Sequence, residues 1–158
     1  MKSKKIVGVV NMCNEWSGPE SQYSKVGIEQ LRLQTFDTMS PTLENLEKGI
    51  SFINNKLKKN KNEKIFIHCK GGIGRAATMG LAYYISKGMN IEDAFQLLKS
   101  KRSIVHSKIK EYPAISLLEK KSPRVSKLII TSSLRIFLIM KRAKVLLILI
   151  RIGELSEG

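Results

Sequence analysis

Several residue types are scarce in this chain of 158 residues, and each scarcity excludes a class of protein. Only two cysteines are present, so the chain is not a disulfide scaffold, and without a secretory leader they indicate a reducing compartment. No run of 18 uncharged apolar residues occurs, so a simple transmembrane span is not expected. Aromatic residues make up only 6%, and no stacking platform or reading helix is present, which disfavours a nucleic-acid-binding module.

Acidic side chains are scarce as well, with 13 Asp and Glu against 28 Lys and Arg, a formal net charge of +15. Such a charge predicts affinity for anions: phosphate groups, acidic lipid surfaces or nucleic acid. Residues 1–120 carry 20 basic and 11 acidic side chains, whereas residues 121–158 carry 8 and 2. We therefore expect one domain over residues 1–120 and a basic, apolar tail over residues 121–158.

Hydrophobic patterning predicts strands that alternate with helices, which is typical of an α/β protein with a mostly parallel central sheet flanked by helices on both faces. Ser40 is the expected N-cap of the first long helix, with Pro41 at its first position, and Asn90 is the expected N-cap of a later helix. The predicted strands are residues 5–12, 27–33 and 64–68, the predicted helices are 41–57, 75–87, 91–101 and 112–118, and residues 14–24 form a loop.

The most informative stretch is the sequence IFIHCKGGIGR over residues 65–75, where a buried strand leads through a glycine-rich loop into a helix. In this geometry the backbone N–H groups of the loop converge on one point, and the helix N-terminus adds a positive partial charge there. Cys69 would be held as a nucleophilic thiolate, and the Arg75 fork would bind two phosphoryl oxygens. The predicted phosphate-binding residues are Lys70, Gly71, Gly72, Ile73, Gly74 and Arg75.

The pattern H-C-x-x-G-x-x-R of residues 68–75 resembles the signature of cysteine-dependent phosphatases, in particular their dual-specificity branch. Residues 27–33, 41–49, 77–79 and 102–106 are similar to one subgroup, the mitochondrial tyrosine-phosphatase-like enzymes that dephosphorylate phosphatidylglycerophosphate on the way to cardiolipin. The resemblance covers about residues 5–118 and implies the dual-specificity phosphatase fold. Because the chain starts almost at a strand that follows an earlier segment in this family, we expect a domain that lacks its N-terminal elements.

The resemblance implies a monomeric phosphomonoester hydrolase that acts through a phosphocysteine intermediate and needs no cofactor. Its expected substrate is phosphatidylglycerophosphate, and its expected location is the mitochondrial inner membrane, or the cytoplasm if the subgroup does not apply. Two alternatives stay open. The chain could be a protein tyrosine, serine or threonine phosphatase, or it could be a pseudophosphatase that binds a phosphorylated partner without turnover.

A thiolate mechanism needs an acid that protonates the leaving oxygen, and the chain has only two aspartates. Asp93 lies in the first turn of a predicted helix, where it complements the helix dipole. Asp37 follows a predicted strand at the spacing that the family uses for its acid, so we assign it as general acid and then as base. The alternative for Asp37 is an ordinary loop aspartate that makes a local turn.

The other candidate residues have supporting roles. His68 is expected to be a structural hydrogen-bonding partner of Cys69, and Arg102 and His106 are expected to support the loop. Cys13 is expected to be a buried residue of apolar character, with a redox role beside Cys69 as the alternative. No cluster has the spacing of metal ligands, so no metal is predicted.

Two features depart from the family pattern. Ala76 stands where the family usually has a hydroxyl residue that helps the thiolate leave, so we expect slower breakdown of the intermediate. The resemblance also stops near residue 118. Residues 121–158 have three interpretations: peripheral contact with an anionic membrane, an extra element packed on the domain, or translated sequence from outside the true reading frame.

Overall fold

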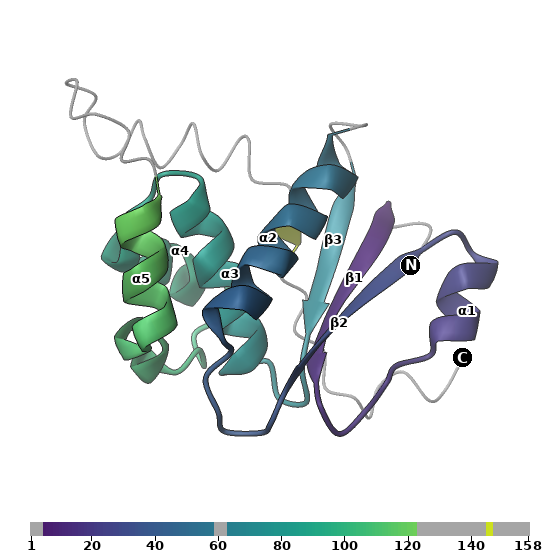
Figure 1. Ribbon diagram of the computed structural model, residues 1–158, viewed down its shortest axis with the longest axis horizontal. Coiled ribbons are helices and arrows are strands. Elements are labelled where there is room, and N and C mark those ends of the chain that lie inside the picture. The colour runs from purple at the N-terminus through teal and green to yellow at the C-terminus, as the bar shows by residue number, and fades with distance from the viewer. Residues whose placement is uncertain (1–4, 59–62, 123–144, 147–158) are drawn as a thin grey trace.

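The computed structural model describes residues 5–58, 63–122 and 145–146, and it shows an α/β domain in which a sheet lies beside a layer of helices (Figure 1). The class is the one predicted from the alternation of strands and helices. The elements in chain order are β1 (Ile6–Cys13), α1 (Glu20–Lys25), β2 (Glu29–Thr35), α2 (Leu43–Leu57), β3 (Lys64–His68), α3 (Arg75–Ser86), α4 (Ile91–Lys101), the 3-10 helix η2 (Ser107–Glu111), α5 (Pro113–Lys121) and β4 (Val145–Leu146).

The strands are parallel and lie in the order β2-β1-β3-β4. β1 pairs on both sides, since Val9 lies opposite Gln30 of β2 and opposite Phe66 of β3. β4 has two residues and pairs with β3. Because parallel strands end at the same edge, the segments that follow β1, β2 and β3 all begin at one edge of the sheet.

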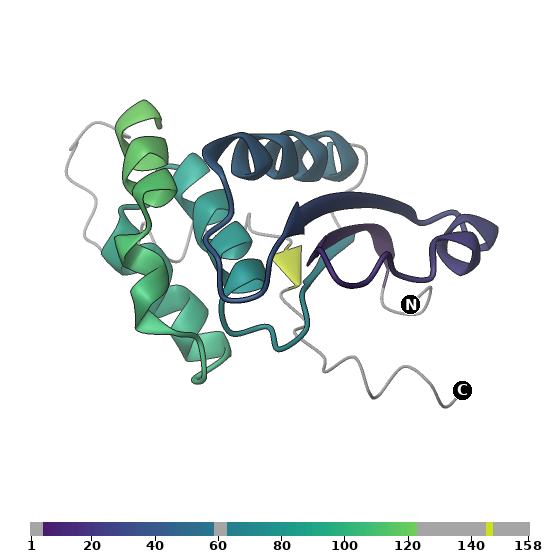
Figure 2. The ribbon, with the colours of Figure 1, turned by 60° about the horizontal axis from the view of Figure 1, so that its bottom comes forward.

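The two faces of the sheet are covered unequally, as the turned view shows (Figure 2). Val10 points into the main core, which α2 and α3 complete, whereas its neighbour Val9 lies in a small cluster on the opposite face with Tyr23 of α1. The prediction that residues 14–24 form only a loop is wrong at its end, where α1 begins at Glu20. This six-residue helix is too short to be stable alone, and burial of Tyr23 against the sheet holds it.

Helix α3 is the centre of the helical layer and packs against α2, α4, α5 and the sheet. Every residue from Arg75 to Ile85 is buried. Small side chains such as Ala76 and Gly80 let neighbouring elements approach closely. The first residues of α3 therefore belong to the most enclosed part of the molecule, and so does the end of the loop that leads into it.

Side-chain caps mark the first residues of two helices, α4 and α2. The side chain of Asn90 accepts a hydrogen bond from the backbone N–H of Asp93, which confirms the predicted cap of α4. The cap of α2 differs from the prediction, because Thr42, not Ser40, accepts from the backbone N–H of Asn45 at 3.2 Å. Other boundaries shift by up to three residues, with β2 ending at Thr35 and α5 running over Pro113–Lys121.

The predicted membrane contact of the tail falls on residues outside the described part of the chain, apart from β4. Among the residues that the structure describes, no helix has both the length and the apolar character that a membrane crossing requires.

Candidate active site

The loop between β3 and α3 surrounds a buried thiol. Cys69 follows the last residue of β3 and is only 3% exposed. The backbone N–H of Gly72 donates to Cys69 Sγ at 3.3 Å, so the loop turns back over the sulfur. Gly72 has a φ of +68°, a conformation that side chains other than glycine adopt only with strain. We call residues 70–74 the phosphate loop.

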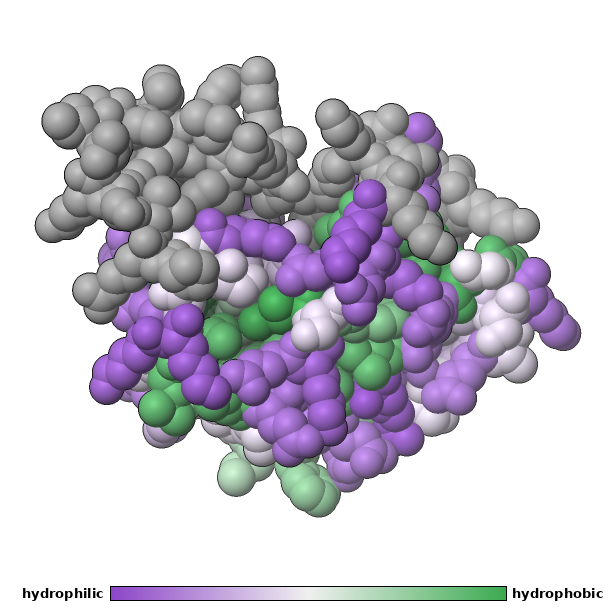
Figure 3. Space-filling view, turned by 45° about the horizontal axis from the view of Figure 1, so that its top comes forward, coloured by the Kyte–Doolittle hydropathy of each residue, from purple (hydrophilic) through white to green (hydrophobic). Residues whose placement is uncertain are grey.

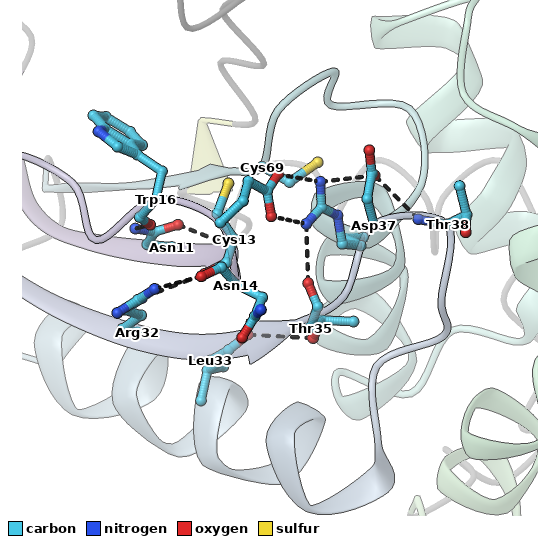
Figure 4. Close-up of polar contacts among 12 residues, drawn as sticks. Asn11, Cys13, Asn14, Trp16, Arg32, Leu33, Thr35, Asp37, Thr38 and Cys69 are labelled. Atoms are coloured by element: carbon cyan, nitrogen blue, oxygen red, sulfur yellow. Dashed lines mark hydrogen bonds and ion pairs between the residues drawn. The ribbon is translucent and has the colours of Figure 1, made fainter.

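Arg75 opens α3, and its contacts join the segments at the ends of three strands. Figure 4 shows Thr35, Asp37 and Cys69, which come from two of these segments, lying close together. The Arg75 side chain is 3% exposed and donates to both carboxylate oxygens of Glu15, at 2.7 and 2.8 Å. It also donates to the carbonyl of Thr35 at 2.9 Å and forms an ion pair with Asp37 at 2.8 Å. Glu15 follows β1, Thr35 ends β2, and Arg75 comes from the segment after β3, so one guanidinium holds the edge together.

The contacts of Arg75 occupy most of the hydrogen-bond donors of its guanidinium. A guanidinium has five N–H donors, and the contacts to Glu15, Thr35 and Asp37 engage the donors on both terminal nitrogens. The hydrogen bonds from Arg75 lower the pKa of Glu15 to about 2, because they favour its charged form. The same hydrogen bonds raise the pKa of Arg75, and the nearby Cys69 and Asp37 add to this effect.

Glu15 was not among the residues singled out from the sequence. Its position depends on the turn after β1, which two side chains hold. Asn11, fully buried, donates to the carbonyl of Trp16 at 3.0 Å, and Arg32 of β2 donates to the carbonyl of Asn14 at 2.7 Å. The available signal was a carboxylate two residues after a strand that ends at the same sheet edge as Cys69.

Cys13, the last residue of β1, is fully buried, as expected for a residue of apolar character. Burial raises the pKa of its thiol to about 12, and the Glu15 carboxylate adds to the shift. Cys13 is therefore a protonated thiol at neutral pH, and Cys69 lies close enough to affect it electrostatically.

His68 is buried and its ring lies against two aromatic side chains. The ring stacks on Phe66 with centroids 5.0 Å apart and meets Trp16 edge-on at 5.5 Å. Burial lowers the pKa of His68 to about 4, while a hydrogen bond with the backbone of Cys69 opposes the shift. A neutral, buried ring therefore precedes the phosphate loop, and its Nε2 has no hydrogen-bond partner among the described residues. The expected hydrogen bond between His68 and the Cys69 thiol stays a prediction.

The segment between β2 and α2 carries Asp37, and we call residues 36–41 the acid loop. The Asp37 side chain is 59% exposed, in contrast to its buried partner Arg75. The backbone N–H of Thr38 donates to Asp37 Oδ1 at 3.0 Å, and Thr38 has a φ of +66°. A β-branched residue in this conformation is strained, so the local turn at Asp37 is held in place by its surroundings.

A third segment supports the phosphate loop from behind. Arg102 donates to the carbonyl of Gly71 at 3.2 Å, and the backbone N–H of His106 donates to the carbonyl of Ile73 at 3.0 Å. These contacts are with the backbone of the loop, in line with the expected supporting roles. Lys70 is exposed at the loop surface. The described residues include no group of His, Cys, Asp and Glu side chains that could hold a metal ion.

A thiol beneath a backbone amide, a buried guanidinium beside it and a carboxylate on the facing loop form the arrangement of a cysteine-dependent phosphatase, and the fold agrees with this class. Residues 1–121 match the family described as dual specificity phosphatase, catalytic domain. The chain belongs to this family.

Individual proteins and solved structures of this family are similar to the chain over much of its length. The human protein named phosphatidylglycerophosphatase and protein-tyrosine phosphatase 1 is 34% identical over 114 residues, which are 67% of this chain and 55% of that protein. The crystal structure of PTPMT1 is 30% identical, with a TM-score of 0.65, over 73% of this chain and 77% of that one. The crystal structure of Tk-PTP in the active form supports the fold, with a TM-score of 0.67 at 24% identity over 76% of this chain and 82% of that one. The chain spans about half the length of the curated relatives it matches.

Proposed function

We propose that this protein hydrolyses a phosphomonoester through a phosphocysteine intermediate at Cys69, and that its substrate is phosphatidylglycerophosphate. One observation supports this chemistry. The thiol of Cys69 accepts a hydrogen bond from a loop N–H, and the buried Arg75 forms an ion pair with Asp37. Nucleophile, phosphate-binding group and acid come from three different segments and meet at one sheet edge.

In the first step, Cys69 Sγ attacks the phosphorus atom as the thiolate. The S–P bond forms while the bond from phosphorus to the ester oxygen breaks, and Asp37 gives its proton to the leaving oxygen. The amides of the phosphate loop and the guanidinium of Arg75 stabilise the charge on the equatorial oxygens.

The donors of Arg75 suggest how the substrate enters. Its contacts with Glu15 and Thr35 fix the orientation of the guanidinium from one side. A phosphoryl group approaching from the other side takes the Nε–H and the N–H that now faces Asp37. Substrate binding thus replaces Asp37 at Arg75, which frees its carboxyl group to take up the proton that the first step needs.

In the second step, water attacks phosphorus, Asp37 accepts the proton of the water, and the S–P bond breaks to return Cys69 as the thiolate. Ala76, fully buried at the start of α3, offers no hydroxyl to stabilise the leaving sulfur. The second step is therefore the slow one, and phosphocysteine accumulates.

The choice of substrate rests on the relatives that match the chain over most of the domain, since the human one is named as a phosphatidylglycerophosphatase as well as a tyrosine phosphatase. A location at the mitochondrial inner membrane is part of the same proposal. Relatives named as dual specificity protein phosphatases match shorter stretches, for example 48 residues of the human dual specificity protein phosphatase 1 at 40% identity. A phosphoprotein is therefore the second candidate substrate.

The test is time-resolved phosphate release from dispersed phosphatidylglycerophosphate, with a Cys69→Ser variant as control. We expect an initial burst followed by slower steady release, and no release from the variant. Release from a phosphotyrosine peptide but not from the lipid would overturn the lipid assignment. A burst without steady turnover would show a phosphate-binding protein that does not complete the reaction.

A further inference from the structure

Exposed apolar side chains gather around the candidate site. Among the described residues, six large hydrophobic side chains are exposed, and four of them lie on the segments that surround Cys69. Figure 3 shows pale green hydrophobic side chains projecting at the lower edge of the molecule, beyond the purple surface around them. The four are Phe36 (69% exposed), Met39 (61%), Ile104 (57%) and Ile73 (42%), and we call them the apolar rim.

The structure ties the three rim segments to one another. The acid loop, with Phe36 and Met39, is joined to the phosphate loop region by the Asp37–Arg75 ion pair at 2.8 Å. The segment with Ile104 is joined to the phosphate loop by the hydrogen bond from the N–H of His106 to the carbonyl of Ile73, at 3.0 Å. The four side chains therefore lie on segments that meet around Cys69.

The charge of this surface is positive. Lys70, Lys101 and Lys108 are exposed on or next to the rim segments. The acid loop, the phosphate loop and residues 101–109 contain a single carboxylate, Asp37, which shares the guanidinium of Arg75 with Glu15. The two carboxylates exceed this guanidinium by one negative charge, and the three exposed lysines leave the surface positive. A surface that combines projecting apolar side chains with unbalanced lysines has the composition that binds the interface of an anionic bilayer.

We infer that the apolar rim docks on an anionic lipid bilayer, with Phe36, Met39, Ile73 and Ile104 among the headgroups and the lysines against lipid phosphates. The inference rests on the proposed lipid substrate and adds how that substrate is reached. The phosphate of a membrane lipid enters toward Cys69 while its acyl chains stay in the bilayer. A peptide partner fits less well, because the rim side chains come from three separate segments between helices and strands and not from one strand edge.

The test compares two double variants of the full chain. Met39→Ser with Ile104→Ser removes two rim side chains that make no contact assigned to catalysis. Val26→Ser with Leu117→Ser is the matched control, because these are the exposed hydrophobic residues away from the rim, at 38% and 48% exposure. Both variants keep residues 121–158, so a difference between them reports on the rim.

Binding is measured by co-sedimentation with phosphatidylcholine vesicles that contain phosphatidylglycerol, without substrate. We expect affinity to fall about tenfold in the rim variant and to stay unchanged in the control, and hydrolysis of p-nitrophenyl phosphate to be the same in both. Equal vesicle binding by the two variants would overturn the docking surface. So would a rim variant that keeps its vesicle binding and instead loses activity toward a phosphotyrosine peptide.

The outcomes also separate this inference from the proposed substrate. Wild-type protein that binds the vesicles through the rim but releases no phosphate from phosphatidylglycerophosphate would refute the substrate and keep the docking surface. Protein that hydrolyses a short-chain, soluble phosphatidylglycerophosphate but does not bind the vesicles would refute the docking surface and keep the substrate.

Discussion

The phosphate loop and the acid loop lie at the same edge of the sheet, yet the protein holds them in different ways. The phosphate loop lies between β3 and the most buried helix. Gly72 and the two flanking residues, Cys69 and Arg75, are buried, whereas the rest of the loop reaches the surface. In the acid loop, residues 36–39 are all exposed, and an ion pair joins Asp37 to the rest of the site.

This difference between the two loops matches the different roles proposed for them. In the proposed mechanism, the core holds the nucleophile and its phosphate-binding groups, so their geometry is set before any ligand arrives. The proposed acid is held by an ion pair, which we expect a phosphoryl group to replace, so that substrate binding releases it. Substitutions at Asp37 and substitutions near Cys69 should therefore have separable effects.

The largest effect is expected in the acid loop. Asp37→Asn cannot donate the proton, so phosphate release from an alkyl phosphate should fall by about 10²- to 10⁴-fold. With an aryl phosphate whose leaving oxygen needs no proton, the first step should change little, which steady-state and burst kinetics with both substrates would measure. An equal loss for both substrates would mean that Asp37 orients Arg75 and does not supply the proton.

The next largest effect is expected at His68, just before the phosphate loop. It is a dependence of the free energy of unfolding on pH. Burial lowers the pKa of His68 from 6.5 to about 4, so the unfolded chain binds a proton that the folded chain excludes between these values. The free energy of unfolding should therefore be highest above pH 6.5 and fall by about 3 kcal/mol as the pH drops to about 4.

Urea titrations across this pH range would measure the slope. His68→Asn should flatten the slope, because the side chain that excludes the proton is then absent. A wild-type stability that stays constant from pH 6.5 to 4 would mean that His68 is not held neutral.

A smaller effect separates two glycines of the phosphate loop. Gly72 has a φ of +68°, so Gly72→Ala should lower the free energy of unfolding by about 1–2 kcal/mol and weaken phosphate release. Gly74 has a φ of −118°, outside the left-handed region, and an added Cβ there meets open space, so Gly74→Ala should cost less stability than Gly72→Ala. Denaturant titration of both variants is the measurement, and equal stabilities would show that the loop conformation does not depend on Gly72.

The smallest expected effect is an increase in the steady rate of phosphate release. Ala76→Ser places a hydroxyl at the start of α3, where a hydrogen bond to the leaving sulfur would stabilise it during the second step. Steady phosphate release should rise by up to about tenfold, which corresponds to about 1.4 kcal/mol, while the initial burst becomes smaller. A lower steady rate with an unchanged burst would show that the hydroxyl bonds elsewhere in this buried position.

Local sequence patterns predicted much of this architecture. The strand over residues 64–68 and the helix over residues 91–101 have the predicted bounds, because an apolar β-branched run and an Asn cap with acidic first-turn residues are local signals. Helix α1 was missed because its stability comes from Tyr23 packing on a distant strand. The Ser40 cap was misplaced by two residues, since two hydroxyl residues flank Pro41 and only the backbone path selects Thr42.

For the site, the spacing from His68 to Arg75 indicated the chemistry because nucleophile, amides and guanidinium lie within one loop. Glu15 could not be found in this way, since it meets Arg75 across 60 residues of chain. The same holds for the apolar rim, whose members are apolar residues of three unrelated segments and form one surface only after the loops converge.

The sequence by itself determined the class of the fold, the loop that surrounds Cys69 and the residue types proposed to bind a phosphoryl group, because these depend on neighbours in the chain. The tertiary structure decided which carboxylates contact Arg75 and which exposed apolar side chains lie on neighbouring segments. The physical reason is that ion pairs and surfaces depend on distances in space, and these are set by the pairing of parallel strands whose ends meet at one edge.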